Sequence, residues 1–101
     1  MNWIKIAQTS EVAEDESIAI ETNGKQLALH FSENEYFVTD NVCTHQYALL
    51  SDGYIEDGCV ECPLHQAKFD LRTGQAMCAP ATVDIQTYSV KVEGDDIYVA
   101  L

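Results

Sequence analysis

The chain is short of positive charge. Its 101 residues include 5 Lys and Arg against 17 Asp and Glu, which gives a formal net charge of −12. Such a charge repels the phosphate backbone of nucleic acids and the headgroups of anionic lipids. We therefore expect neither nucleic acid nor a membrane surface as a partner. The acidity has two explanations, solubility or steering toward a basic face of another protein, and composition does not choose between them.

Long apolar runs are also missing. No stretch approaches the roughly 18 apolar residues that a membrane-spanning helix needs. Residues 1–6 alternate polar and apolar side chains, whereas an export signal has a basic start followed by an apolar segment. We therefore expect a cytoplasmic protein. Because thiols stay reduced in that compartment, the four cysteines indicate metal or redox chemistry before structural disulfides.

Helical periodicity is absent too, and strand patterns dominate instead. Short runs rich in β-branched and aromatic residues predict strands at 18–20, 26–31, 36–38, 88–92 and 97–101. Asn23-Gly24 predicts a tight hairpin, and residues 32–35 and 93–96 predict slightly longer hairpin loops. The length suits one compact domain with its own core. We predict a single all-β domain over residues 1–101, an antiparallel sandwich or small barrel.

Residues 41–80 differ from their flanks. They hold all four cysteines, both prolines and three of the five glycines. Such residues are typical of loops that approach a prosthetic group closely, while the flanking strands act as a scaffold. We therefore expect the chemistry of the protein to lie in this inserted portion.

Two boxes of metal-ligand type stand out in this portion. They are Cys43-Thr44-His45 and Cys62-Pro63-Leu64-His65, with sixteen residues between His45 and Cys62. Each offers one thiolate and one imidazole, which suits a [2Fe–2S] cluster with both cysteines on one iron and both histidines on the other. Zinc also takes two sulfur and two nitrogen ligands. A zinc finger, however, normally carries its second ligand pair on a helix, and this chain offers turns between strands.

The two boxes resemble the signature of Rieske-type [2Fe–2S] proteins, and the resemblance extends over nearly the whole chain. Trp3 and residues 50–54, 69–74 and 88–92 are similar to the ferredoxin components of bacterial ring-hydroxylating dioxygenases, such as those of naphthalene and biphenyl dioxygenases. An alternative is a small Rieske-type subunit of another reductase complex, of the nitrite reductase kind. Such subunits can lack cluster ligands, and all four are present here.

The resemblance implies a function as well as a fold. Cys43, His45, Cys62 and His65 would bind one [2Fe–2S] cluster per chain, with the histidine edges reaching solvent as the electron exit. The chain would carry electrons from a flavin-dependent ferredoxin reductase to a terminal oxygenase. It would bind no small-molecule substrate and would have no enzyme activity of its own, because every iron coordination position is filled.

Some positions depart from the pattern of related proteins. Gln46 stands where the family usually has Gly, and Ala67 where it often has Gly. High-potential Rieske proteins carry a pair of disulfide-forming cysteines, where this chain has Ala48 and Leu64. They also place hydroxyl groups of Ser and Tyr where this chain has Ala67 and Phe69. Without those hydrogen bonds to sulfur we predict a reduction potential near the low end of the Rieske range, about −150 mV.

The remaining cysteines and the third histidine are expected to be structural. We predict that Cys59 and Cys78 are small buried hydrophobic residues and that neither is a ligand. Residues 78–80 resemble the proline-containing loop that shields Rieske clusters. His30 lies in an apolar run without a neighbouring cysteine, which favours a strand-face histidine. Tyr47 follows the first box, and we expect it at the surface near the imidazoles.

Overall fold

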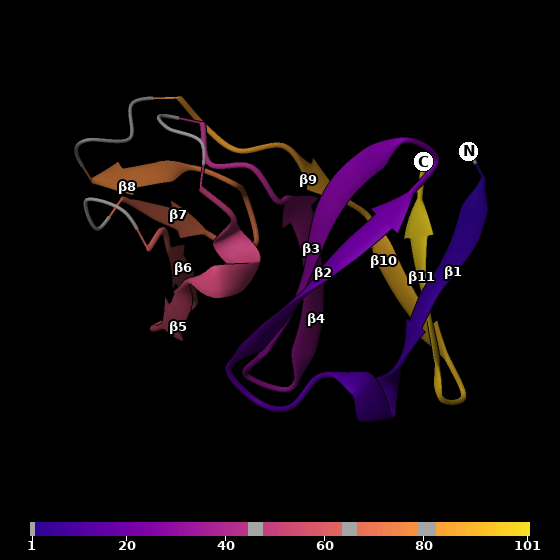
Figure 1. Cartoon of the computed structure of the whole chain (residues 1–101). Coiled ribbons are helices and arrows are strands. Elements are labelled where there is room, and N and C mark those ends of the chain that lie inside the picture. Colours follow the sequence, from indigo (N-terminus) through magenta and orange to yellow (C-terminus); the bar gives the residue numbers. More distant parts are fainter. Residues whose placement is uncertain (1, 45–47, 64–66, 79–82) are drawn as a thin grey trace.

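The structure is a computed structural model that describes residues 2–44, 48–63, 67–78 and 83–101. Within these ranges the chain forms eleven strands and two 3₁₀ turns, arranged as three antiparallel sheets (Figure 1). The first sheet has the order β1 (Trp3–Gln8), β11 (Asp96–Ala100), β10 (Val90–Glu93). The second has the order β2 (Glu16–Thr22), β3 (Lys25–Ser32), β4 (Glu35–Asp40), β9 (Thr87–Tyr88). The third has the order β5 (Tyr54–Glu56), β6 (Cys59–Glu61), β7 (Lys68–Asp70), β8 (Ala76–Cys78).

The all-β prediction is confirmed. Every predicted strand is present, although the run at 88–92 is divided between β9 and β10. The acidic segment before β2 contains only the 3₁₀ turn η1 (Thr9–Glu11). No helix among the described residues is long and apolar enough to cross a bilayer.

The hairpin turns are tighter than the sequence indicates. Asn23 and Gly24 take φ angles of 51° and 73°, as expected for a two-residue turn of type I′. The loop at 32–35 was expected to be longer, yet Ser32 pairs directly with Glu35. Its two central residues, Glu33 and Asn34, both have positive φ, which a glutamate seldom adopts and the sequence therefore does not indicate. The turn before β11 likewise has two residues, because Glu93 pairs with Asp96.

Two hydrophobic cores follow from the alternation of side chains along the strands. The first lies between the first and second sheets and contains buried Leu27, Leu29, Val38, Ile97 and Val99. The second lies within the portion that carries the third sheet, and it contains buried Leu50, Val60, Phe69, Leu71 and Ile85. The chain leaves the second sheet after β4 and returns to it at β9. The second core belongs to the segment between these two strands, residues 41–86, which we call the excursion.

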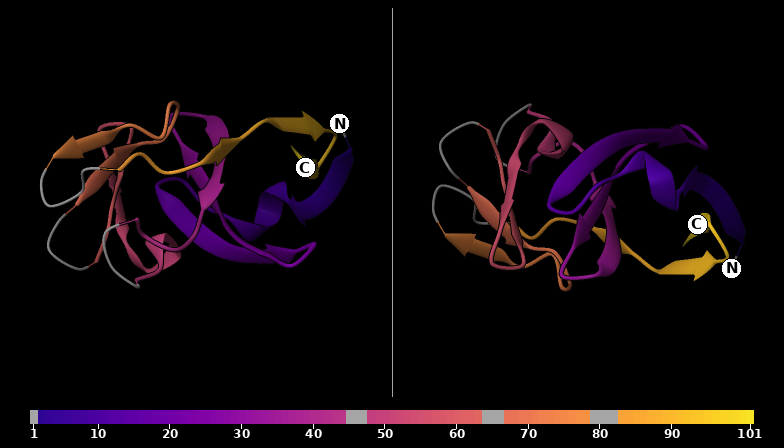
Figure 2. Two further views of the ribbon diagram at one scale, coloured as in Figure 1. Left: turned by 90° about the horizontal axis from the view of Figure 1, so that it is seen from above. Right: turned by 90° about the horizontal axis from the view of Figure 1, so that it is seen from below.

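The excursion packs against the open face of the second sheet. Its 3₁₀ turn η2 (Leu50–Asp52) lies against β2 and β3, and β5 also contacts β2. Views from above and below place β7 and β8 at the end of the molecule opposite both termini (Figure 2). The two scaffold sheets therefore support the excursion from one side.

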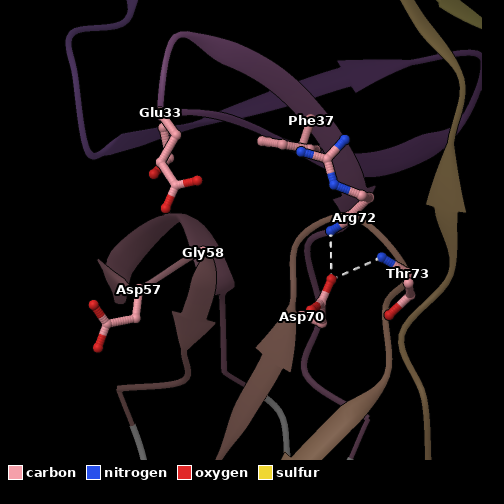
Figure 3. A pocket seen from close by; sticks show the side chains of 8 residues that line it. Glu33, Phe37, Asp57, Gly58, Asp70, Arg72 and Thr73 are labelled. Carbon is pink, nitrogen blue, oxygen red and sulfur yellow. Dashed lines mark hydrogen bonds between the residues drawn. The ribbon is translucent and has the colours of Figure 1, made fainter.

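A polar cavity of about 240 Å³ lies where the excursion meets the scaffold (Figure 3). Asp70 Oδ1 accepts hydrogen bonds from the backbone N–H groups of Arg72 (2.8 Å) and Thr73 (3.0 Å). The Arg72 guanidinium pairs with Glu35 at 2.7 Å and lies 5.3 Å from the centre of the Phe37 ring. Neither Cys43 nor Cys62 is among the described residues that line it, and the contacts of Arg72 tie the excursion to β4.

Candidate metal centre

Two loops of the excursion are closed in the same way, and each begins with a predicted cysteine ligand. The Cys43 N–H donates to the carbonyl of Ala48 at 2.8 Å, and the Cys62 N–H donates to the carbonyl of Ala67 at 2.7 Å. Four residues lie between the donor and the acceptor of each bond. The spacing within the two ligand boxes does not by itself show that the loops have this equal length. The predicted ligands His45 and His65 lie outside the described residues.

Both cysteines are buried in one core. Cys43 is 4 % exposed and Cys62 is fully buried, and both belong to the cluster built around Phe69 and Val60. Burying the negative charge of a thiolate in apolar surroundings is costly unless a metal or hydrogen-bond donors balance it. Two buried cysteines at the head of two matched loops therefore fit a shared metal group. This pair is the half of the predicted ligand set that the structure describes.

The two loops have unequal stems. The second loop continues directly into the ladder of β6 and β7, in which Glu61 pairs with Lys68 and Val60 pairs with Phe69. Among the residues that the structure describes, the stem of the first loop is one isolated bridge, between Val42 and Leu49. Because it lacks strands to continue the ladder, the first loop needs another form of support.

Asn41 supplies that support. It is buried, and its backbone N–H donates to the carbonyl of Gln26 in β3 at 2.9 Å while its carbonyl accepts from the Leu50 N–H at 2.8 Å. Its side-chain Oδ1 accepts from the Ser51 N–H at 2.8 Å, and its Nδ2 donates to Ser51 Oγ at 3.0 Å. The base of the first loop is thereby fixed both to the scaffold and to η2. The sequence analysis missed this residue, because its partner lies ten positions away and no motif joins them.

A third segment reaches the first loop through Val83. The Thr44 hydroxyl donates to the Val83 carbonyl at 2.7 Å, and Asp84 Oδ1 accepts from the Ala76 N–H at 2.9 Å. The Ile85 N–H donates to the carbonyl of Gly74, whose φ is +79° and whose Cβ position is occupied by the Ile85 carbonyl. Only glycine fits there without displacement. These bonds join residues 74–76 to residues 84–85, which follow residues 79–82 in the chain.

The positions predicted to tune a cluster are buried next to the ligands. Ala67 closes the second loop and Phe69 lies two residues further along, and neither is accessible to solvent. Ala48 closes the first loop and is also buried. Neither Ala67 nor Phe69 carries a hydroxyl that could donate a hydrogen bond to a cluster sulfur. The low reduction potential stays a prediction. Leu64, Gln46 and Tyr47 lie outside the described residues.

The expectation that Cys59 is buried holds only in part. It is half-buried in β6, on the face of the third sheet opposite the buried Val60, because successive side chains of a strand alternate between faces. Cys78 ends β8, and its side chain lies outside what the structure describes. The shielding loop predicted at 78–80 falls mostly within the same undescribed segment.

His30 is the strand-face histidine that the sequence predicts. It lies in β3 and is completely buried, with Nδ1 2.6 Å from Ser17 Oγ and Nε2 2.9 Å from Thr39 Oγ1. Thr39 Oγ1 donates its own hydrogen to the Asp40 carbonyl, so it accepts from His30 Nε2–H. Ser17 then donates to Nδ1, and the ring is neutral. Burial lowers the pKa of His30 from 6.5 to about 4.

Comparison with known proteins identifies the group that this geometry suits. The family model of the Rieske [2Fe–2S] domain matches residues 2–89. The chain is 48 % identical to the ferredoxin component of the naphthalene 1,2-dioxygenase/salicylate 5-hydroxylase systems of Ralstonia sp, over 91 % of this chain and 88 % of that one. The solved Sphingomonas yanoikuyae B1 ferredoxin superposes with a TM-score of 0.93 at 36 % identity, covering 99 % of both chains.

A further solved structure is a complex of reduced oxygenase and oxidised ferredoxin in carbazole 1,9a-dioxygenase. It matches with a TM-score of 0.90 at 29 % identity, over 97 % of this chain and 92 % of that one. These matches favour the iron–sulfur cluster over zinc and a dioxygenase system over the nitrite reductase alternative. The chain therefore belongs to the Rieske [2Fe–2S] ferredoxin components of aromatic-ring dioxygenase systems, and it is an electron carrier rather than a catalytic subunit.

Proposed function

We propose that the chain accepts one electron from a flavin-dependent ferredoxin reductase and delivers it to the terminal oxygenase of its dioxygenase system. Cys43, His45, Cys62 and His65 are the proposed ligands. The observation that carries the ligand proposal is the pair of matched loops, each opening on a buried cysteine and each closed by the same backbone hydrogen bond. A bound [2Fe–2S] group supplies reversible one-electron chemistry without making or breaking bonds to a substrate.

The residues of this chain have defined tasks in that function. Cys43 and Cys62 offer thiolates inside an apolar core, where Phe69 and Val60 exclude water. Asn41 holds the base of the first loop, and the β6–β7 ladder holds the base of the second. We assign the whole chain, residues 1–101, to one Rieske domain with its cluster-binding portion at about 41–80. It works in the cytoplasm, with protein partners only and no nucleic acid, membrane or small-molecule substrate.

Metal analysis of the purified protein tests the ligand assignment. We expect two irons and two acid-labile sulfides per chain. Both should be lost in Cys43→Ser and His65→Ala, because each variant lacks one ligand and with it part of the metal-binding free energy that is coupled to folding. Cys59→Ser is the matched control and keeps its iron, since Cys59 lies on the opposite face of β6 from the core. Stoichiometric zinc in protein produced with ample iron, or full iron in Cys43→Ser, contradicts the assignment.

A further inference from the structure

Gly53 lies at the junction between the two loops that begin with the predicted cysteine ligands. It follows η2, whose first residue Leu50 is bonded to the base of the first loop, and it leads directly into β5 (Figure 1). Strand β5 pairs with β6 so that Tyr54 lies opposite Glu61. Continuing this antiparallel register by one position places Gly53 opposite Cys62, the first residue of the second loop.

The backbone of Glu61 packs directly against Gly53. A Cβ atom on residue 53 would overlap the Glu61 carbonyl oxygen, and it would lie 3.1 Å from the Glu61 carbonyl carbon and 3.2 Å from the Leu50 carbonyl oxygen. The φ and ψ angles of Gly53 are −90° and −158°, which is extended backbone that is open to residues other than glycine. Glycine is therefore required here by the close approach of β6 and not by its conformational freedom.

Neither side of this contact can give way without moving the support of a ligand loop. On one side, the Leu50 N–H donates to the Asn41 carbonyl at 2.8 Å, and the Leu50 side chain is fully buried. On the other side, the peptide unit between Glu61 and Cys62 is held by the bond from the Cys62 N–H to the Ala67 carbonyl at 2.7 Å. Because closely packed interiors transmit strain, a group inserted between the two supports would change the distance between the loops.

We propose that Gly53 is a positioning residue that sets the distance between the two ligand loops, and with it the geometry and the reduction potential of the bound cluster. The proposal rests on the proposed function, because Cys43 and Cys62 are ligands only under that assignment. Both cysteines lie in one buried core, so a change in loop spacing reaches them directly. Groups that orient the ligands of a metal site tune its redox potential although they do not touch the metal.

Gly53→Ala tests the proposal in the holoprotein. Because the methyl group has to push the Glu61 peptide or the end of η2 aside, we expect a changed visible circular dichroism spectrum and changed g values in the electron paramagnetic resonance spectrum of the reduced protein. The equilibrium constant for reduction by a mediator should change by about threefold or more, which is about 28 mV on the one-electron scale of about 59 mV per tenfold. Iron release to a chelator should also become faster.

Gly58→Ala is the matched control, since it adds the same methyl group at the other end of the β5–β6 hairpin. Gly58 has a φ of +76°, and the nearest described atom to its Cβ position is Glu33 Oε1 at 3.9 Å. Alanine is strained at that φ, so this variant loses stability without displacing either ligand loop. Its spectra and reduction potential should match those of the wild type, although its denaturation midpoint falls.

Wild-type spectra and potential in iron-loaded Gly53→Ala, or equal changes in both variants, overturn the proposal and leave the ligand assignment intact. If Gly53→Ala takes up no iron, hydrogen exchange of its apoprotein is compared with that of the wild-type apoprotein. Loss of protection confined to the amides of Cys43 and Cys62 supports the proposal. Unchanged protection, or a loss that extends to Leu27 and Leu29 in β3, contradicts it. A wild-type protein that binds no [2Fe–2S] cluster overturns the proposed function instead.

Discussion

At the scale of single side chains, two buried positions at the second loop are those at which we expect hydroxyl groups to tune a bound cluster. Ala67 and Phe69 are inaccessible to solvent and carry no hydroxyl. We expect Ala67→Ser combined with Phe69→Tyr to raise the reduction potential, because a hydroxyl that donates to a cluster sulfur favours the reduced, more negative state. At about 1 kcal/mol per bond the gain is about 40 mV each, or about 80 mV for the pair.

Protein-film voltammetry measures that potential, and iron analysis shows that the metal content is unchanged. The double variant should accept electrons from the reductase more readily and pass them on less readily. Unchanged potential in a variant whose crystal structure shows both hydroxyls bonded to sulfur would contradict the tuning argument and leave the ligands untouched.

Asn41 acts at the same scale through Ser51 and the first loop. Asn41→Ala removes two side-chain hydrogen bonds from a buried site and leaves the Ser51 N–H without its acceptor, which costs roughly 1–3 kcal/mol. We expect faster release of iron to a chelator and a changed visible circular dichroism spectrum. Asn41→Asp keeps the acceptor oxygen and should retain most of the wild-type behaviour.

Tyr88→Phe is the control, since it removes the hydrogen bond to Asp40 on the neighbouring β4 without touching the first loop. Equal iron release in the control would show that Asn41 has no special role.

At the scale of elements, the sequence predicts the scaffold better than the excursion. The scaffold strands β2, β3 and β4 are six to eight residues long, and their pairing follows from adjacent hairpins. The strands of the third sheet have three residues each, too few for a pattern to stand out. The ligand boxes are readable because Cys and His recur at short spacing. The Asn41 bonds and the contact between Thr44 and Val83 are not, because they join residues that only the folded chain brings together.

The second sheet contains a buried histidine, His30, that makes the stability of the folded protein depend on pH. The pKa of His30 is about 4 in the folded protein and 6.5 in an unfolded chain, so between these values the unfolded state binds more protons. The contribution of neutral His30 to the free energy of unfolding is therefore fully present above pH 6.5, and it is lost as the pH falls toward 4. The full difference corresponds to roughly 3 kcal/mol. We expect chemical denaturation of the holoprotein to show this loss.

A non-titrating variant separates His30 from the many carboxylates. His30→Gln should be less stable than the wild type at pH 7, because its contacts with Ser17 and Thr39 change. The stability difference between the two proteins should shrink as the pH falls from 7 to 4.5. A difference that stays constant over that range would mean that His30 keeps the same protonation state in both the folded and unfolded chains.

At the scale of the whole molecule, charge is distributed unevenly along the chain, because residues 42–51, 62–67 and 74–83 contain none of its Asp, Glu, Lys or Arg residues. Four of the five basic side chains already lie within 4 Å of a carboxylate, so the excess negative charge faces solvent. The acidic turns are linked on one side of the scaffold, where the Glu33 N–H donates to Glu14 and the Thr9 N–H donates to the Asp95 carbonyl. Figure 1 shows η1 and the turn between β10 and β11 along its lower side, away from β8.

The net charge of −12 predicts how association and dissociation respond to salt. An acidic protein is attracted to a basic face of a partner at a distance, and such attraction is screened beyond about 10 Å at 0.1 M ionic strength. We therefore expect the association rate with the oxygenase to fall by about three- to tenfold between 0.05 and 0.5 M salt. The dissociation rate should change less, because electrostatic steering acts chiefly on the approach of the two proteins. Surface plasmon resonance measures both rates, and an association rate that is flat or rises with salt would show that the negative charge does not steer docking.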